Sequence, residues 1–110
     1  MRAIYVTGEG AAVMDVKNEL KAFQKGVDGY IEVFRFASDA AIICNEEGLL
    51  KGMPVRVLVV DKGDKVVTGI AGNFFIVGSD PECDDFIELS EKRANELALQ
   101  CCTRKLLFEE

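Results

Sequence analysis

The first third of the chain has a hydrophobic pattern that fits two structures. Apolar and β-branched residues at 3–7 predict a strand. Beyond it, apolar residues recur at spacings of three and four, which favours one long helix after the glycines at 8 and 10. These apolar positions are Val13, Val16, Leu20, Phe23 and Val27. In the alternative, 8–10 form a hairpin turn, 12–16 are a second strand, and Asn18 caps a shorter helix.

The expected end of this helix is the same in both structures, because Gly26 and Gly29 interrupt the pattern and Gly29 suits a left-handed cap position. Residues 30–36 then alternate between apolar and polar, which indicates a half-buried strand. Further strands are predicted at 40–44, 55–60, 65–68 and 73–77, and the last of them is continuously apolar like a central strand. The Asp-Lys-Gly-Asp sequence at 61–64 is typical of a hairpin.

The C-terminal part of the chain predicts a second helix, with Ser90 as its cap. One face of this helix would carry Ala94, Leu97, Ala98 and Cys101, and an adjoining face would carry Leu99, Cys102 and Leu106. So broad an apolar surface fits either a helix that lies deep against the sheet or one that also contacts a second chain.

Together these elements predict an α+β fold with a mostly antiparallel, mixed sheet of about six to seven short strands. One helix follows the N-terminal strands and one lies at the C-terminus. The length of 110 residues suits one domain, so residues 1–110 are expected to form a single α+β domain. No apolar run approaches the ~20 residues of a membrane span, and Glu9 comes too early for a signal peptide. We therefore expect a cytoplasmic protein without a membrane partner.

Composition shifts the expectation from catalysis towards binding. The chain has no His, which removes His-based triads, dyads and metal sites. Its four cysteines, Cys44, Cys83, Cys101 and Cys102, form no Cys-x-x-Cys pair, so we expect reduced thiols and neither a zinc site nor another cofactor. Acid–base chemistry near neutral pH would need a carboxylate, Lys, Tyr or Cys with a strongly shifted pKa. We therefore favour a protein without enzymatic activity.

Negative charge is concentrated near the C-terminus. Thirteen Lys and Arg against nineteen Asp and Glu give a net charge of −6. Five acids with no base between them form a run: Asp80, Glu82, Asp84, Asp85 and Glu88. This run does not fit the ligand spacing of a calcium loop, and it precedes a helix start, which favours negative charge. It also fits an acidic patch that imitates DNA, whereas the overall acidity argues against binding to a nucleic-acid backbone.

A polar tip between two predicted strands is the second candidate site. Its residues 45–48 fit an ordinary turn, but recognition residues are common in loops on a rigid sheet. The candidate binding residues are Tyr30, Glu32, Asn45, Glu46, Gly48, Gly72 and Asn73. Convergence of Tyr30, Glu32, Asn45 and Glu46 in a deep pocket would indicate a small-ligand-binding domain or an enzyme, whereas scattered, exposed side chains would argue against both.

An ordered series of short motifs resembles a known family. The motifs are Gly-Tyr-Ile-Glu-Val at 29–33, Ile-Cys-Asn-Glu-Glu-Gly at 43–48, Gly-Met-Pro at 52–54, Ile-Ala-Gly-Asn-Phe-Phe-Ile-Val-Gly at 70–78 and Asp-Asp-Phe at 84–86. Across about residues 3–97, this series resembles the family named domain of unknown function 3846. Its members occur mainly in phages, plasmids and conjugative elements of bacteria, and in their hosts.

The resemblance implies a compact α+β domain and a mobile-element or gut-bacterial setting, without an established activity, ligand or catalytic residue. It favours the N-terminal hairpin over the long helix, because relatives tend to have turn-forming and charged residues where Ala11 and Ala12 stand. Relatives often follow the equivalent of Met53 and Pro54 with Asn-Arg, whereas this chain continues with Val-Arg-Val. A polar site built on that Asn is therefore not expected here.

These observations predict a non-enzymatic accessory protein of a mobile element or its bacterial host. It would act by binding another protein, or a second copy of itself as a homodimer. Two alternatives stay open, namely a small-ligand-binding domain and an acidic inhibitor of a DNA-binding protein.

Overall fold

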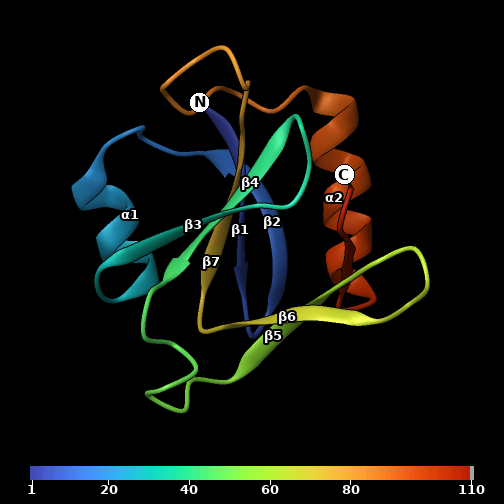
Figure 1. The fold of residues 1–110 in the computed structure, drawn as a ribbon. Coiled ribbons are helices and arrows are strands. Elements are labelled where there is room, and N and C mark those ends of the chain that lie inside the picture. The colour runs from blue at the N-terminus through green and yellow to red at the C-terminus, as the bar shows by residue number, and fades with distance from the viewer. Residues whose placement is uncertain (110) are drawn as a thin grey trace.

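Eight strands and two helices make up the fold in the computed structural model, which describes residues 1–109 (Figure 1). The strands are β1 (Arg2–Thr7), β2 (Gly10–Asp15), β3 (Ile31–Arg35), β4 (Ala40–Asn45), β5 (Val55–Val60), β6 (Val66–Ala71), β7 (Phe74–Gly78) and β8 (Lys105–Leu107). The helices are α1 (Leu20–Val27) and α2 (Glu91–Cys102).

The strands are divided between two sheets. The order is β2-β1-β7-β4-β3 in a five-stranded sheet and β6-β5-β8 in a three-stranded sheet. All neighbouring strands are antiparallel except β5 and β8, which are parallel. The predicted α+β class, with mostly antiparallel strands and two helices, is confirmed. The eighth strand and the separation into two sheets were not predicted.

The middle of the larger sheet is buried on both faces, which explains its continuous apolar sequence. Phe74 and Ile76 of β7 belong to the core on one side, whereas Phe75 and Val77 belong to the core on the other. Successive side chains of a strand point to opposite faces, so a strand covered on both sides needs apolar residues throughout. The neighbouring strand β4 is likewise buried at all six positions.

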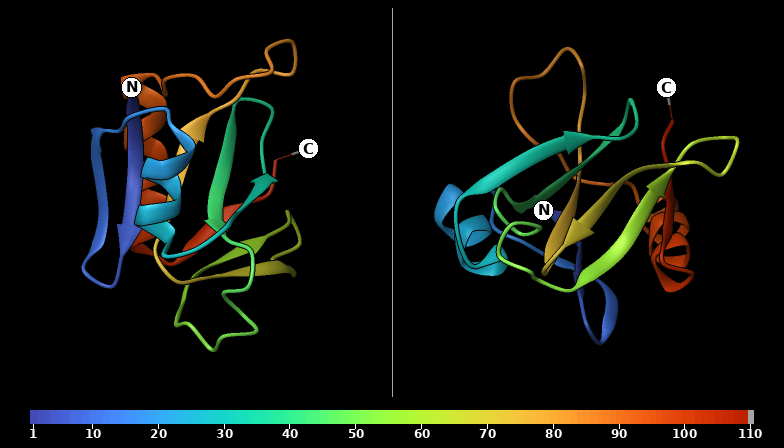
Figure 2. Two further views of the ribbon diagram at one scale, coloured as in Figure 1. Left: turned by 90° about the vertical axis from the view of Figure 1, so that its left-hand side faces the viewer. Right: turned by 60° about the horizontal axis from the view of Figure 1, so that its bottom comes forward.

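Different elements cover the two faces of the larger sheet (Figure 2). Helix α1 lies on one face and contacts β7, β4 and β3. The other face is shared by α2, which packs against β1 and β2, and by the smaller sheet, whose strand β6 reaches β4. On this second face Phe34 of β3 stacks on Phe108, with ring centroids 6.0 Å apart, and is only half-buried. The inner face of the edge strand β3 is thus left partly open.

The N-terminal segment forms the hairpin, so the long helix is wrong and the alternative favoured by the family resemblance is correct. Strand β2 pairs with β1 along its whole length, from Arg2 with Asp15 to Thr7 with Gly10. Gly10 has a φ of 120°, which glycine adopts without a steric penalty. Val13, whose spacing suggested a helical stripe, is instead an exposed residue of β2.

Both ends of α1 differ from the prediction. Asn18 is not its cap, because the Asn18 side chain donates to Asp85 Oδ1 and to the carbonyl of Phe86. The cap position is Glu19, without a capping hydrogen bond from its side chain. At the other end, Asp28 rather than Gly29 takes the left-handed cap conformation, with φ 60° and ψ 47°.

Gly26 lies inside α1 and does not end it. The helix approaches β7 so closely there that a Cβ on Gly26 would lie 2.3 Å from ring carbons of Phe75. Tyr5 supports the same contact, since its ring stacks on Phe75 and its hydroxyl donates to the Gly26 carbonyl at 2.7 Å. Gly26 is therefore needed for packing and not for a turn.

The last helix begins as predicted and ends earlier than predicted. Ser90 Oγ accepts a hydrogen bond from the backbone N–H of Arg93 at 3.1 Å, as a cap does. The helix stops at Cys102, so Leu106 does not lie on its second face. Instead Leu106 is fully buried in β8, which pairs with β5. Within residues 1–109 neither helix has the length and apolar content to cross a membrane.

The Gly26 contact predicts that Gly26→Ala lowers the free energy of unfolding by about 1–3 kcal/mol, because the added methyl group overpacks the interface with Phe75. Alanine is the better helix former by about 1 kcal/mol, so a gain in stability would be expected if the contact were loose. Urea unfolding followed by circular dichroism measures the change. Lys25→Ala, at an exposed position of the same helix, is the control and should change little. A Gly26→Ala variant as stable as the wild type would contradict the contact.

Candidate functional site

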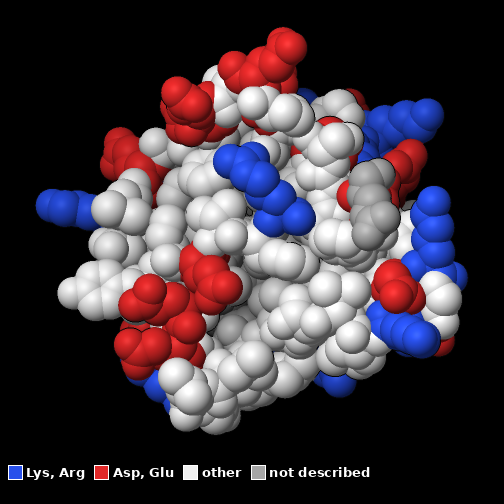
Figure 3. All heavy atoms as spheres, viewed as in Figure 1, with Lys and Arg blue, Asp and Glu red and all other residues white. Residues whose placement is uncertain are grey.

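A groove of about 500 Å³ lies between β3 and β6, where β3 is left partly open. It is lined by Glu32, Phe34, Cys44, Asn45, Glu46, Gly48, Leu49, Leu50 and residues 67–71. We call it the β3–β6 groove. Figure 3 shows this face of the molecule, on which acidic side chains gather beside uncharged surface.

The groove has a floor and a wall of different kinds. Its floor is one face of the larger sheet, because Glu32 and Phe34 are two apart on β3 and Cys44 is the partner of Glu32 on β4. Its wall is β6, from which the five consecutive residues 67–71 all line the groove. Side chains of a strand alternate between two faces, so such a continuous run means that β6 borders the groove with its backbone edge.

Two leucines of the loop after β4, residues 46–54, lie at the border of the groove and are exposed to solvent. Leu50 is 88% exposed and Leu49 is 60% exposed. Glu32 and Glu46 line the same groove, and neither carboxylate is in an ion pair within the described residues. The groove therefore combines exposed apolar side chains with unpaired negative charge.

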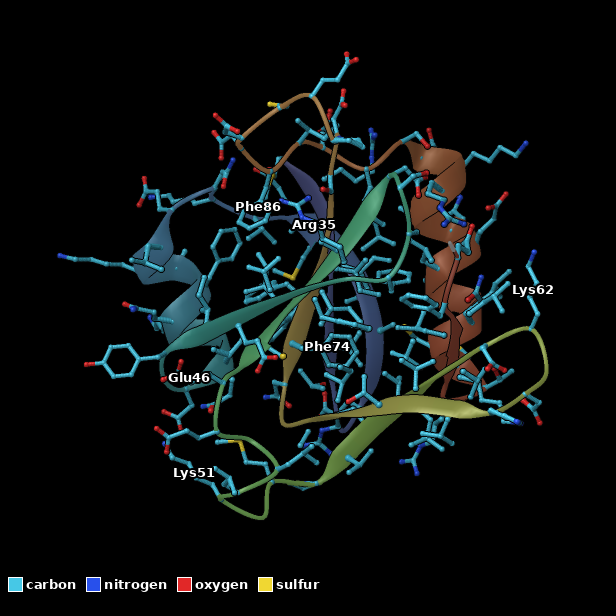
Figure 4. The ribbon with its side chains drawn as sticks, viewed as in Figure 1. Arg35, Glu46, Lys51, Lys62, Phe74 and Phe86 are labelled. Atoms are coloured by element: carbon cyan, nitrogen blue, oxygen red, sulfur yellow. The ribbon has the colours of Figure 1, made fainter. Side chains whose placement is uncertain are left out.

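A shallower pocket of about 320 Å³ adjoins the groove and shares Asn45 and Glu46 with it. Its other lining residues are Gln24, Gly29, Tyr30, Glu47 and Lys51. Glu46 and Lys51 lie on the same side of the molecule, towards the C-terminal end of β4 (Figure 4). The two hollows are thus joined across the start of this loop.

Asn45 holds this loop and the end of α1 together. Its side chain is only 5% exposed, and its Nδ2 donates to the carbonyls of Val27 and Asp28, at 3.1 Å each. Its Oδ1 accepts from the backbone N–H of Glu47 at 2.8 Å. Because these bonds use the amide group within the chain, Asn45 positions the loop rather than offering a free polar group to a ligand.

Gly48 sets how closely the loop approaches β6. A Cβ on Gly48 would lie 2.8 Å from the carbonyl oxygen of Ala71, so a larger residue would push the loop away. Gly72 also has a conformational role, since its φ is 78° and it packs against the sulfur of Met53. Neither Gly72 nor its neighbour Asn73 lines the groove or the adjoining pocket.

Five of the seven candidate binding residues therefore converge: Tyr30, Glu32, Asn45, Glu46 and Gly48. Asn73 lies apart from them and accepts a hydrogen bond from Arg56 Nη2 at 3.3 Å. Sequence reasoning missed Leu49, Leu50 and the edge of β6. An adjacent pair of leucines between Gly48 and Gly52, where a turn is expected, was the available signal.

Most of the chain matches a known protein family. Residues 1–101 match the family model described as Domain of unknown function (DUF3846). The chain belongs to the DUF3846 family. Comparisons with curated proteins and with solved structures gave no match. The assignment confirms the resemblance and gives no residue of this DUF3846 domain a role.

The acidic run of the DUF3846 domain forms the loop before α2, and three of its carboxylates bind backbone or side-chain groups of the chain itself. Asp80 accepts from the N–H of Glu82, Asp85 accepts from Asn18, and Glu88 accepts from the N–H of Arg2. All five residues of the run are exposed. The run precedes α2, and the acid within the first turn of this helix is Glu91.

No group of three or more Cys, Asp or Glu within residues 1–109 is arranged to hold a metal ion. Cys44, on the floor of the groove, donates weakly to the carbonyl of Glu32 at 3.8 Å. Burial, and to a lesser extent the charge of Glu32, raises the pKa of the Cys44 thiol to about 11. At neutral pH the groove therefore presents a protonated thiol, which is a poor nucleophile.

Asn45→Ala should lower the free energy of unfolding by about 2–3 kcal/mol, because it leaves the buried carbonyl of Val27 and the partly buried N–H of Glu47 without partners. Chemical denaturation measures the effect. Asn95→Ala, at an exposed position of α2, is the matched control and should stay within about 0.5 kcal/mol of the wild type. Equal stability of the two variants would contradict the bracing role of Asn45.

The raised pKa of Cys44 predicts slow alkylation. At pH 8 its thiolate fraction is about 100-fold below that of an ordinary thiol, so iodoacetamide should label Cys44 far more slowly than the exposed Cys102. The rate at Cys44 should rise about tenfold per pH unit until the pH nears 11, because the raised pKa keeps the thiol protonated below it. Peptide mass spectrometry of the folded protein gives both rates. Labelling of Cys44 as fast as that of Cys102 would contradict this environment.

Proposed function

We propose that this DUF3846 domain is a non-enzymatic protein-interaction module, an accessory protein of a mobile element or its bacterial host, and that the β3–β6 groove is its contact surface. The observation that carries the proposal is the pair Leu49 and Leu50, which stand 60% and 88% exposed beside an open groove. Exposed apolar patches with a polar border are typical of surfaces that another protein covers.

The chemistry of the groove favours a protein over a small molecule. Small-ligand sites fix their ligand with a few convergent polar groups. In the groove, the buried side-chain amide of Asn45 already forms hydrogen bonds with backbone groups of the chain itself. The groove is bordered along one side by the strand edge at 67–71, which suits a long partner better than a compact one. The protonated Cys44 thiol and the absence of His also speak for binding over catalysis.

The acidic-inhibitor alternative has weaker support. A surface that imitates DNA needs carboxylates that are free to meet the partner's basic groups. Three of the five carboxylates in the run at 80–88 accept hydrogen bonds from the chain itself, and these bonds explain them as parts of the loop.

Selection from a displayed library of linear 12-residue peptides tests the proposal. Peptides selected on the wild type should bind the double variant Leu49→Asp and Leu50→Asp at least about tenfold more weakly, because the variant removes the apolar border. Both leucines are exposed, so the fold should survive, which circular dichroism checks. Leu99→Asp is the matched control, since Leu99 is 70% exposed on α2 and should leave binding unchanged. No enrichment on the wild type over the double variant would refute the proposal.

A further inference from the structure

We infer that the occupant of the β3–β6 groove is an extended, basic segment of the partner protein, which adds as a strand to the open edge of β6. The inference rests on the proposed function and goes further by assigning the conformation and the charge of the bound segment. Three features carry it: the unpaired edge, the charges on the floor and border, and the spacing of the floor residues.

The edge of β6 is free to pair. Within residues 1–109, β6 neighbours only β5 in its sheet, and apart from two register shifts this antiparallel pair uses the backbone groups of alternate residues. The N–H and C=O groups of the other residues point away from β5, towards the side on which β6 borders the groove. Main-chain pairing of this kind is a general way for a domain to bind an extended peptide.

The sequence of β6 leaves this edge unprotected. Of the four edge strands of the two described sheets, β2 carries Asp15, β3 carries Glu32 and Arg35, and β8 carries Lys105. Strand β6, with the sequence Val-Val-Thr-Gly-Ile-Ala, carries no charge and no proline. Charged residues and proline are the usual protection of an edge against pairing. Among these edge strands β6 alone lacks both, and the register shifts of its pair with β5 are the irregularity along this edge, so we infer that it pairs when the partner is present.

The charges around the groove select a basic segment. Glu32 on the floor and Glu46 at the border have no ion-pair partner within residues 1–109, and Glu47 lies in the adjoining pocket together with one base, Lys51. The whole chain has a net charge of −6, which attracts a basic segment at long range. Complementary charge of this sort sets specificity and association rate.

The floor also predicts a sequence pattern in the bound segment. Glu32 and Phe34 point to the same side of β3, two residues apart. An added strand presents alternate side chains to this floor, so a Lys or Arg opposite Glu32 should lie two residues from an apolar residue opposite Phe34. The wall at 67–71 is five residues long, and the loop at Gly48 covers the Ala71 carbonyl at one end, so the wall matches a bound strand of about four or five residues, or roughly 14–17 Å.

Two measurements on the library-selected peptides test the inference. Glu32→Lys and Glu46→Lys together should weaken binding about tenfold. Glu82→Lys and Asp84→Lys together make the same change of net charge at exposed positions of the acidic loop, and should weaken it less than about twofold. A single N-methyl group, moved along the peptide backbone, should abolish binding at alternate positions within a run of about five and leave it nearly unchanged at the positions between.

The outcomes separate this inference from the proposed function. The selected peptides could depend on Leu49 and Leu50 yet tolerate charge reversal at Glu32 and Glu46 and show no alternating effect of N-methylation. That result would overturn the strand inference and leave the groove as the contact surface. Peptides that bind the leucine double variant as well as the wild type would overturn the proposed function itself. If the two charge-reversal double variants weakened binding equally, the inference would also be overturned. The weaker binding would then depend on the net charge of the protein and not on Glu32 and Glu46.

Discussion

Burial of β4 and β7 on both faces is the constraint on which the rest of the structure depends. Their residues are apolar on both sides, so each face of the larger sheet must be covered. Helix α1 covers one face. The other is shared between α2 over β1 and β2 and the smaller sheet, whose β6 reaches β4. This cover ends before the edge strand β3, and the β3–β6 groove is the space that remains.

The groove is therefore a consequence of the fold, and its border is held by specific residues. Asn45 donates two hydrogen bonds to the end of α1 and accepts a third from the loop, and Gly48 lets the loop approach Ala71. This bracing holds Leu49 and Leu50 in solvent beside the groove, where contact of apolar side chains with water costs free energy that the proposed partner would relieve by covering them. Under the proposed function, stability and binding would thus be linked at one loop.

The parts of the fold that depend on local pattern could be predicted from the sequence. The continuous apolar run of β7 and the cap at Ser90 needed no knowledge of distant contacts. Val13 was misplaced by periodicity, since its spacing favours a helical stripe although the residue lies in β2. Leu106 was assigned to the wrong element, because β8 exists through its pairing with β5, more than forty residues earlier. Convergence of Tyr30, Glu32 and the 45–48 loop followed from antiparallel pairing, whereas the groove itself depends on how far β6 covers the sheet.

The most direct test of this account locates the contact surface on the folded protein. A ¹⁵N-labelled domain titrated with a library-selected peptide should show its largest chemical-shift changes at Glu32, Phe34, Leu49, Leu50 and residues 67–71. Changes concentrated on the exposed face of α2 or on the loop at 80–88, with the groove residues unmoved, would contradict the claim that the partner binds where the cover of the larger sheet ends.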